Sequence, residues 1–354
     1  MRSVIYVIVA LVVVRCVPVP SAPDVTTTPL TPGGVFVVCE GLWRQNNATL
    51  SYCTPSGTSE RDVVSTRNAD LRLGDTGSDI LVHGDSVYVC ASSSGSIEVF
   101  HRNTGIWQGR ILFERGREPY KLALLNDTSA VCSILNEDCI AEVHLRKLTV
   151  RVAKAPTGPA PEGLCVMGNN IYVANSGLGD LRSNEEGAGT VSILDVRDLR
   201  IVNTVRGLPN VMDCIADARR NRVWIVYRNL ASQPDSLGGV VLFDPATNSI
   251  IDHQRYASPK GLVVDPETGR IYVLHLTGVH SYDHDTRVAT PLIEHRSGNG
   301  NDVWYSLGWW REQNILLVGN ARSYVTDGEV IAIDLDGTVR FRSSVGLNPA
   351  AFED

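Results

Sequence analysis

The sequence has 354 residues, with 32 Lys or Arg against 39 Asp or Glu, and its formal net charge is -7. The basic residues do not gather into a stripe, which argues against nucleic acid as a partner. Many short runs rich in Val and Ile are separated by Gly, Asn, Asp and Pro, a pattern typical of an all-β protein.

Residues 1–21 predict a secretory signal. Met1 and Arg2 form a short basic end, and residues 4–14 are almost wholly apolar. A membrane-spanning helix needs roughly 20 apolar residues, which is longer than this run. We therefore expect an exported protein.

Cys16 follows the apolar run, where a bacterial lipoprotein carries its acylated cysteine. This position predicts a lipid anchor, membrane contact through that anchor only, and a place on the outer-membrane surface. Arg15 is unusual before such a cysteine, and the alternative is ordinary cleavage near Ser21, which would discard Cys16. Residues 17–34 are rich in Pro, Thr and Ser and predict a flexible tether.

Repeated units organise the rest of the chain. Apolar runs interrupted by a tight turn recur at residues 79–92, 120–135, 163–177, 211–228, 261–276 and 303–320. Each run is followed by further strand-like segments that complete a four-stranded unit. Units of roughly 40 to 47 residues with four short strands are typical of β-propeller blades.

The two ends of this array predict how the ring closes. Residues 35–40 match the second strand of a unit, and residues 49–53 and 62–66 match its third and fourth. Residues 346–354 resemble the start of another unit, and we expect them to supply the missing inner strand. The prediction is an all-β, seven-bladed propeller over residues 35–354, with antiparallel blades and no exposed sheet edge at the closure.

The eight cysteines of an exported chain first suggest disulfides. Cys39, Cys90 and Cys132 occupy equivalent places in neighbouring units, which we expect to lie beyond the roughly 7 Å Cα limit for a bridge. Cys165 and Cys214 also fall inside apolar strands, so we favour buried, reduced thiols. Sequence alone leaves open the pairing of Cys39, Cys53, Cys90, Cys132, Cys139, Cys165 and Cys214. No CxxC pair occurs, and no metal site is predicted.

The long, irregular loops of the units are expected on one face of the ring, and the short turns on the other. Long loops on a rigid scaffold are a common place for binding. Large aromatic side chains, Arg and neutral amides suit a sizeable polar ligand. On these loops the candidate contacts are Trp43, Arg44, Asn47, Tyr120, Asn175, Asn210, Arg228, Asn320, Arg322 and Tyr324.

Three further candidates are His275, Asn301 and Trp304, which we expect near the mouth of the ring. The neighbouring Trp309 and Trp310 favour core packing instead. For any one candidate, the alternative is a hydrogen bond inside its own loop.

Signatures of catalysis are absent from the sequence: it has no GxSxG elbow, no HExxH and no phosphate-binding glycine loop. We therefore predict no catalytic residues, no cofactor and no enzyme activity. A lactonase-like hydrolase is the weakest alternative, because it needs several acidic residues around a metal and only Asp213 and Asp302 are candidates.

The segments at residues 38–52, 72–90, 161–178 and 327–352 resemble those of the YncE-like propellers that Gram-negative gut anaerobes export. Within that family the chain resembles the BtuG-type surface lipoproteins. The resemblance implies capture of cobalamin or another corrinoid as a transported ligand, and its transfer to a TonB-dependent outer-membrane transporter. The alternatives are another ligand, such as a glycan or haem, and a protein-interaction module.

Overall fold

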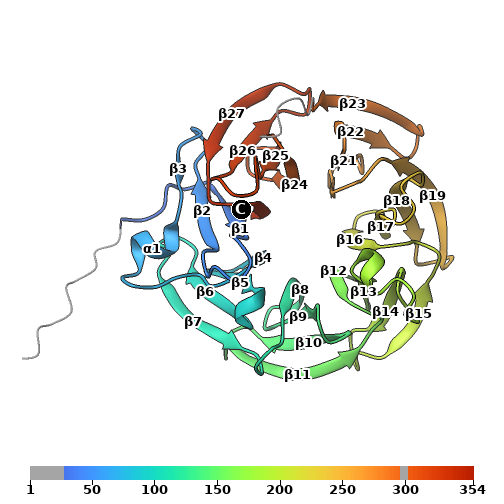
Figure 1. Ribbon diagram of the computed structural model, residues 1–354, viewed down its shortest axis with the longest axis horizontal. Coiled ribbons are helices and arrows are strands. Elements are labelled where there is room, and N and C mark those ends of the chain that lie inside the picture. The colour runs from blue at the N-terminus through green and yellow to red at the C-terminus, as the bar shows by residue number, and fades with distance from the viewer. Residues whose placement is uncertain (1–27, 296–301) are drawn as a thin grey trace, which may run out of the picture.

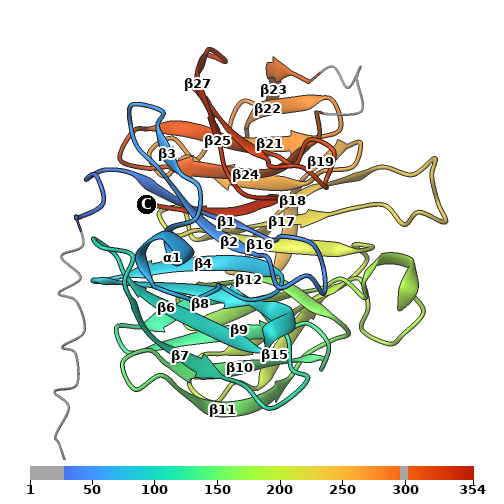
Figure 2. The ribbon, with the colours of Figure 1, turned by 60° about the vertical axis from the view of Figure 1, so that its left-hand side comes forward.

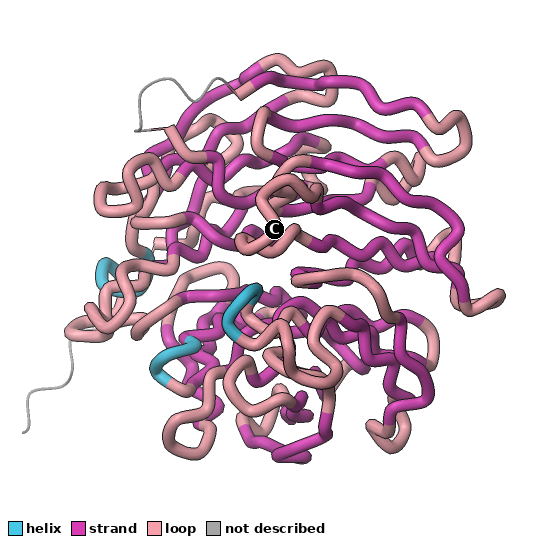
Figure 3. Tube along the Cα trace, turned by 45° about the vertical axis from the view of Figure 1, so that its right-hand side comes forward, coloured by secondary structure: helices cyan, strands magenta, loops and turns pink. Residues whose placement is uncertain are grey.

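The computed structural model describes residues 28–295 and 302–354. These residues form seven four-stranded antiparallel sheets arranged as blades around a central axis (Figure 1). Figure 3 shows that the described chain is almost entirely strand and loop. Its three helical segments are short. The predicted seven-bladed propeller is confirmed. The expected signal at residues 1–21, Cys16, most of the tether and Asn301 lie outside the described residues.

Blades two to four follow a simple order, in which each strand pairs with the next one along the chain. Blade two contains β4 (Gly77–His83), β5 (Ser86–Ala91), β6 (Ser96–His101) and β7 (Trp107–Leu112). Blade three contains β8 (Pro119–Asn126), β9 (Ser129–Ile134), β10 (Cys139–His144) and β11 (Thr149–Pro156). Blade four contains β12 (Pro161–Met167), β13 (Asn170–Asn175), β14 (Thr190–Asp195) and β15 (Ile201–Val205). The short 3-10 helices η1 (Ser92–Ser94) and η2 (Gly179–Leu181) lie in loops.

Blades five to seven repeat this order. Blade five contains β16 (Val211–Asp217), β17 (Arg222–Tyr227), β18 (Gly238–Asp244) and β19 (Ser249–Tyr256). Blade six contains β20 (Gly261–Val264), β21 (Ile271–His275), β22 (Gly278–Asp283) and β23 (Val288–Glu294). Blade seven contains β24 (Trp304–Trp310), β25 (Ile315–Asn320), β26 (Glu329–Ile333) and β27 (Val339–Ser344).

Blade one joins the two ends of the described chain. Its order is β28-β1-β2-β3, so β28 (Pro349–Glu353) is the inner strand beside β1 (Val35–Cys39), with β2 (Thr49–Cys53) and β3 (Ser59–Glu60) outside. The predicted closure by the C-terminal strand is therefore confirmed.

The expected fourth strand of blade one at residues 62–66 is wrong, because this segment begins the helix α1 (Val63–Arg67). Asp62 caps that helix, since its carboxylate accepts hydrogen bonds from the Val64 and Ser65 amides at 3.1 and 3.3 Å. A local side-chain cap thus outweighs the β preference of the two valines.

Burial explains why the blades hold together. The second and third strands of a blade lie between neighbouring sheets, and every residue of β9 and β25 is buried. An outer strand has one face in solvent, as the alternating exposure of β11 shows. The core is a series of apolar layers between adjacent blades, such as the one that brings Tyr172 of blade four against Phe243 of blade five.

The seven described cysteines are buried, and none of them forms a disulfide. Cys90 and Cys132 belong to neighbouring blades. Burial is the largest cause that raises the pKa of the Cys90 thiol well above its usual value, and the nearby Cys132 thiol helps to raise it.

Antiparallel order gives the ring two different faces. The loop face carries the connections from the second to the third strand of each blade and the connections between blades, and the turn face carries all other turns. Figure 2 shows the loops after β13 and after β17 projecting from the same side. The predicted division into a face of long loops and a face of short turns agrees with this topology. No helix among the described residues is long and apolar enough to cross a membrane.

Candidate functional site

The inner strands begin at the loop face, and the first residues of each are irregular. β4, β8, β12, β16 and β24 each shift register after their first residue, as β-bulges do. A bulge redirects the side chains beside it. Several residues at or beside these bulges are polar, and they interact with residues of other blades around the axis.

We call this group the axial cluster. It consists of Glu40, Asp79, Tyr120, Lys121, Glu162, Asp213, Arg228 and Tyr305, which are connected by hydrogen bonds and charge interactions. Its members come from six of the seven blades, because Glu40 follows β1 and Arg228 follows β17.

One ion pair in the axial cluster crosses an entire blade. Lys121 Nζ of blade three lies 2.5 Å from Asp213 Oδ2 of blade five. Blade four places Gly163 against Asp213, and a Cβ at Gly163 would come within 2.1 Å of Asp213 Oδ1. Glycine is therefore required at residue 163 for the ion pair to form across the axis.

Asp79 extends this pair. Its side chain is 8% exposed, and its Oδ2 accepts a hydrogen bond from the Leu122 amide at 2.8 Å. Burial raises the pKa of Asp79 to about 7, although nearby Lys121 acts in the opposite direction. Burial also lowers the pKa of Lys121, but Asp213 and Asp79 outweigh it and raise the pKa overall. The lysine is thus held as a cation between two carboxyl groups.

Two more carboxyl groups lie nearer the mouth of the ring. Glu40 Oε2 accepts a hydrogen bond from the Tyr305 hydroxyl at 2.8 Å. Burial raises the pKa of Glu40 and of Glu162 to about 7 each, with Tyr305 and Ser176 respectively opposing the rise by hydrogen bonding. Near neutral pH each group therefore samples both an acceptor-only and a donor form.

Tyr120 lies among these groups. Burial raises the pKa of its hydroxyl, the charges of Glu162 and Glu40 add to the rise, and Arg228 opposes it. The Arg228 Nε donates to the Pro259 carbonyl at 2.8 Å, which fixes its guanidinium at this end of the axis.

A pocket of about 390 Å³ adjoins the axial cluster on the loop face. Ser176 connects the two, because it lines the pocket and lies close enough to Glu162 to oppose the rise in its pKa. Loops of blade four and the connection to blade five form the walls. The lining residues are Ser176, Ser183, Gly187, Ala188, Gly189, Thr190, Arg206, Gly207, Leu208, Pro209, Asn210 and Leu230.

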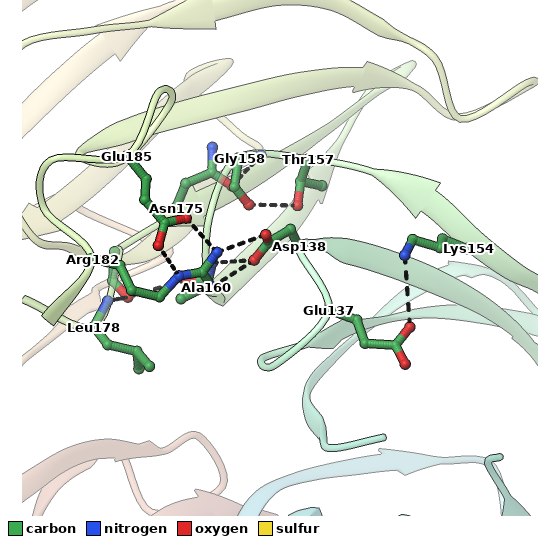
Figure 4. Close-up of polar contacts among 11 residues, drawn as sticks. Glu137, Asp138, Lys154, Thr157, Gly158, Ala160, Asn175, Leu178, Arg182 and Glu185 are labelled. Carbon is green, nitrogen blue, oxygen red and sulfur yellow. Dashed lines mark hydrogen bonds and ion pairs between the residues drawn. The ribbon is translucent and has the colours of Figure 1, made fainter. Parts of the chain in front are cut away.

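Arg182 anchors the long loop at residues 176–189 that forms one wall of this pocket. Figure 4 shows its guanidinium between Asp138 of the neighbouring blade and Glu185 of its own loop. Both Nη atoms donate to Asp138 at 2.7 Å, and the contacts to Glu185 are 2.7 and 2.6 Å. Such two-pronged pairs fix geometry as well as charge. The wall is thus held in place by its own side chains.

Exposed apolar side chains surround the site. On the loop face, the large apolar side chains exposed to solvent are Trp43, Leu178, Leu181, Leu237, Leu276, Tyr324 and Val325. We call them the apolar rim. The other exposed large apolar side chains of the described residues belong to outer strands. Apolar groups around a polar centre are typical of a binding surface.

Several predicted contacts meet in this region. Tyr120 and Arg228 belong to the axial cluster, and the Tyr324 ring packs edge-on against Tyr305 with centroids 6.0 Å apart. Asn210 lines the pocket. Trp43 is 65% exposed, and the Arg44 guanidinium lies 4.1 Å from the centroid of its ring.

Two predicted contacts are buried and form hydrogen bonds within the fold. Asn175 is fully buried, and its amide is used by Gly158, Thr190 and Ser192. Asn320 is equivalent to it in blade seven. Its side chain is 1% exposed and bonds to Val303, Arg322, Asp302 and Glu329. All four hydrogen-bond positions of the Asn320 amide are filled, and three of the four are filled at Asn175.

Other candidates also have partners within the fold. Asn47 accepts a hydrogen bond from the Leu42 amide within its loop, and Arg322 pairs with Glu329 at 3.2 Å. Trp304 is 3% exposed and stacks with His295.

His275 is also placed differently from the prediction. It is 6% exposed, packs against Tyr256 and His280, and has no hydrogen-bond partner among the described residues on either ring nitrogen. Burial, with a smaller effect of His280, lowers the pKa of His275 to about 4. It therefore lies between blades rather than at the mouth of the ring.

Sequence reasoning missed most of the axial cluster. Glu40, Asp79, Lys121, Glu162 and Tyr305 were not predicted. One signal was present: a charged residue interrupts the start of the apolar inner strand in unit after unit. The sequence alone does not show that the first residues of the inner strands converge on one axis, so the role of these charged residues could not be predicted.

The acidic residues considered for a metal site have partners within the fold. Across residues 28–295 and 302–354, no group of three or more His, Cys, Asp or Glu is placed to hold a metal. Asp213 is paired with Lys121, and Asp302 contacts Asn320 and His295.

Comparisons with known proteins agree on the fold. A model of the family described as "Domain of unknown function (DUF5074)" matches residues 33–226. No curated protein matches the chain.

Among solved structures, a quinonprotein alcohol dehydrogenase-like protein from Bacteroides thetaiotaomicron is similar, with 15% identity and a TM-score of 0.66, over 89% of this chain and 76% of that one. The hydrazine synthase of Kuenenia stuttgartiensis has 14% identity and a TM-score of 0.64, over 78% of this chain and 88% of that one. A chain of the mitotic checkpoint complex has 11% identity and a TM-score of 0.61, over 99% and 91%. At these identities the likeness concerns the fold alone.

Proposed function

The chain belongs to the family described as domain of unknown function DUF5074, and we propose that it is an exported propeller that captures a corrinoid such as cobalamin on its loop face. The ligand leaves the protein chemically unchanged. A TonB-dependent outer-membrane transporter receives it, and a lipid on Cys16 holds the propeller at the membrane.

One observation carries this proposal: the 390 Å³ pocket, the axial cluster and the apolar rim all lie at the same face. A corrinoid is large and amphiphilic, with neutral amides around an apolar ring system. The rim offers Trp43 and Tyr324 to the ring edge, and the axial cluster offers polar groups to the amides.

The charge state of the axial carboxyls suits a neutral ligand. With pKa values of about 7, Glu40 and Glu162 can each donate to an amide carbonyl or accept from an amide N–H. Tyr120 and Arg228 add further donors beside them. The ring and the Arg182 anchor hold these groups in place before binding, which lowers the entropy that binding costs.

Calorimetric titration of cyanocobalamin into the chain from Ser21 onward, with thiols kept reduced, tests the proposal. We expect saturable one-to-one binding with nanomolar or tighter affinity. Arg228→Gln removes a charged donor of the axial cluster and should weaken binding at least tenfold. Arg219→Gln, an exposed arginine of the turn face, is the matched control and should leave affinity unchanged.

The absence of binding heat and of thermal protection by cyanocobalamin would refute corrinoid capture. Haem and glycans then become the ligands to test. Equal loss of affinity in both arginine variants would place the ligand away from the axial cluster.

A protein-interaction module is the second candidate function, and the apolar rim is the observation that favours it. Leu181 is 77% exposed and Val325 is 67% exposed, which suits contact with a protein. Co-purification with a co-expressed TonB-dependent transporter should be lost in a Leu181→Ser, Val325→Ser double variant. The corresponding control is Val202→Ser, Val288→Ser on the outer strands.

A further inference from the structure

A second pocket lies on the turn face, at the opposite end of the blades from the site described above. Its volume is about 240 Å³, several times the ~30 Å³ that one water molecule takes in the liquid. Blades five and six form its walls. The lining residues are Asp217, Arg220, Arg222, Trp224, Leu242, Thr268, Gly269, Arg270, Asp283, His284 and Asp285.

Strand β17 supplies the apolar base and one charged wall. Arg222 and Trp224 are two residues apart, so their side chains share one face of the strand. That face packs against blade six, because Trp224 belongs to the apolar layer that contains Leu262, Ile271 and Tyr282. Leu242, the cross-strand partner of Trp224 on β18, completes the base.

The Trp224 indole N–H has no hydrogen-bond partner within the described residues, although the side chain is only 1% exposed. Buried Trp side chains usually find an acceptor for this group, because a buried donor without a partner costs roughly 1–3 kcal/mol. Since Trp224 lines the pocket, a molecule in the pocket is a ready source of the missing acceptor.

Three arginines surround the opening. Arg222 pairs with Asp244 at 2.9 Å, whereas Arg220 and Arg270 lie farther from their partners, Asp217 and Asp283, at 3.4 and 3.5 Å. Each guanidinium has five N–H donors, so one acidic partner leaves donors available. The Arg220 guanidinium lies against Gly269, where a Cβ would come within 2.3 Å of it. That glycine therefore makes room for Arg220 at the rim.

His284 is held in a fixed orientation on the other side. Its Nδ1 lies 2.6 Å from Asp252 Oδ2, and the same oxygen accepts from the Tyr282 hydroxyl at 2.5 Å. Asp252 is 7% exposed. This buried carboxylate fixes both rings, so the pocket wall is formed before any ligand arrives.

We propose that this turn-face pocket binds a small organic monocarboxylate, whose oxygens accept hydrogen bonds from the Trp224 indole and the Arg222 guanidinium. The planar, charged acceptor matches the guanidinium donors. Asp217, Asp283 and Asp285 also line the pocket, and their charges favour one incoming negative charge over two. Trp224 and Leu242 provide an apolar base for the hydrocarbon part of the carboxylate. Inorganic phosphate has no hydrocarbon part to place there.

Nitrogen-15 NMR of the tryptophan indole groups of the purified protein tests the proposal directly. Trp224→Phe identifies the Trp224 indole signal, and butyrate is the probe. We expect a saturable shift of that signal toward a hydrogen-bonded position, with the other indole signals unmoved. Inorganic phosphate and chloride at equal ionic strength should produce a far smaller shift.

Two arginine variants distinguish a built site from general attraction of anions. Arg222→Gln should weaken butyrate binding at least tenfold, while Arg219→Gln should leave it unchanged, because Arg219 is on the same turn but does not line the pocket. An unmoved Trp224 signal, an equal response to chloride, or an equal effect of the two variants would each overturn the proposal. Cobalamin binding at the loop face is independent of every one of these outcomes.

Discussion

The two faces of the ring connect the same strands, but their connections are stabilised differently. On the turn face, acidic side chains close the turns locally: Asp195, Asp244, Asp265 and Asp336 each accept from the backbone amide two residues ahead, at 2.8–2.9 Å. On the loop face, several connections are long, and the one at residues 176–189 is held by a contact between blades, Arg182 with Asp138.

This difference teaches where the fold is specified and where it is free to vary. A turn closed by its own side chain keeps the strand register within one blade. A loop anchored on a neighbouring blade depends on the assembled ring, so its sequence can change with the ligand while the strands stay the same. The predictions that follow compare changes at the loop face and the axis with matched changes elsewhere.

The largest effect is expected at Gly163 in the axial cluster. Gly163→Ala places a methyl group against Asp213, so either the Lys121 ion pair or the β12 backbone must shift. We expect the free energy of unfolding in urea to fall by about 2–3 kcal/mol. Gly261→Ala is the control, since it has the corresponding place in blade six and its nearest neighbours are 3.4 and 3.5 Å away. Equal losses at the two positions would show that the axial ion pair imposes no special constraint.

A smaller effect is expected from the charge of Glu162. Burial raises its pKa from 4.5 to about 7, so in this pH range the folded protein holds a proton that the unfolded chain has released. Stability from this group is therefore present below pH 4.5 and is lost as pH rises through 7.

Glu162→Gln mimics the protonated form. It should match the natural protein at pH 4 and exceed it by about 1–2 kcal/mol at pH 8, as measured by urea unfolding across the range. Glu267→Gln, on the exposed turn face, controls for the change to an amide. A Glu162→Gln variant whose difference from the natural protein does not grow with pH would contradict the raised pKa.

The smallest effect is expected for the loop anchor. Arg182→Gln loses contacts to both Asp138 and Glu185, and we expect a loss of about 1 kcal/mol because these groups are partly exposed. Its clearer sign is faster proteolytic cleavage within residues 176–189. Arg219→Gln breaks an exposed pair on the turn face and should change stability by less than about 0.5 kcal/mol. Unchanged cleavage in the Arg182 variant would mean that the loop is held by other contacts.

The sequence predicted part of the candidate site. The repeat register separated long loops from short turns, and through them it led to Tyr120, Asn210, Arg228 and Tyr324. It could not separate these from Asn175, because an amide at the end of a buried strand looks the same in sequence whether it meets ligand or its own fold. Only the structure shows that the Asn175 amide forms three hydrogen bonds within the fold.

By itself, the sequence determined the seven blades, their antiparallel order and the closure by the C-terminal strand, because alternation of apolar residues and turn chemistry are local and repeat along the chain. Only the tertiary structure decided which residues meet. Lys121 and Asp213 are far apart along the chain and two blades apart in the ring, and their contact also requires the missing side chain of Gly163. Such pairs depend on ring closure, which brings the starts of the inner strands to one axis. A local sequence pattern cannot show which of these residues come close together.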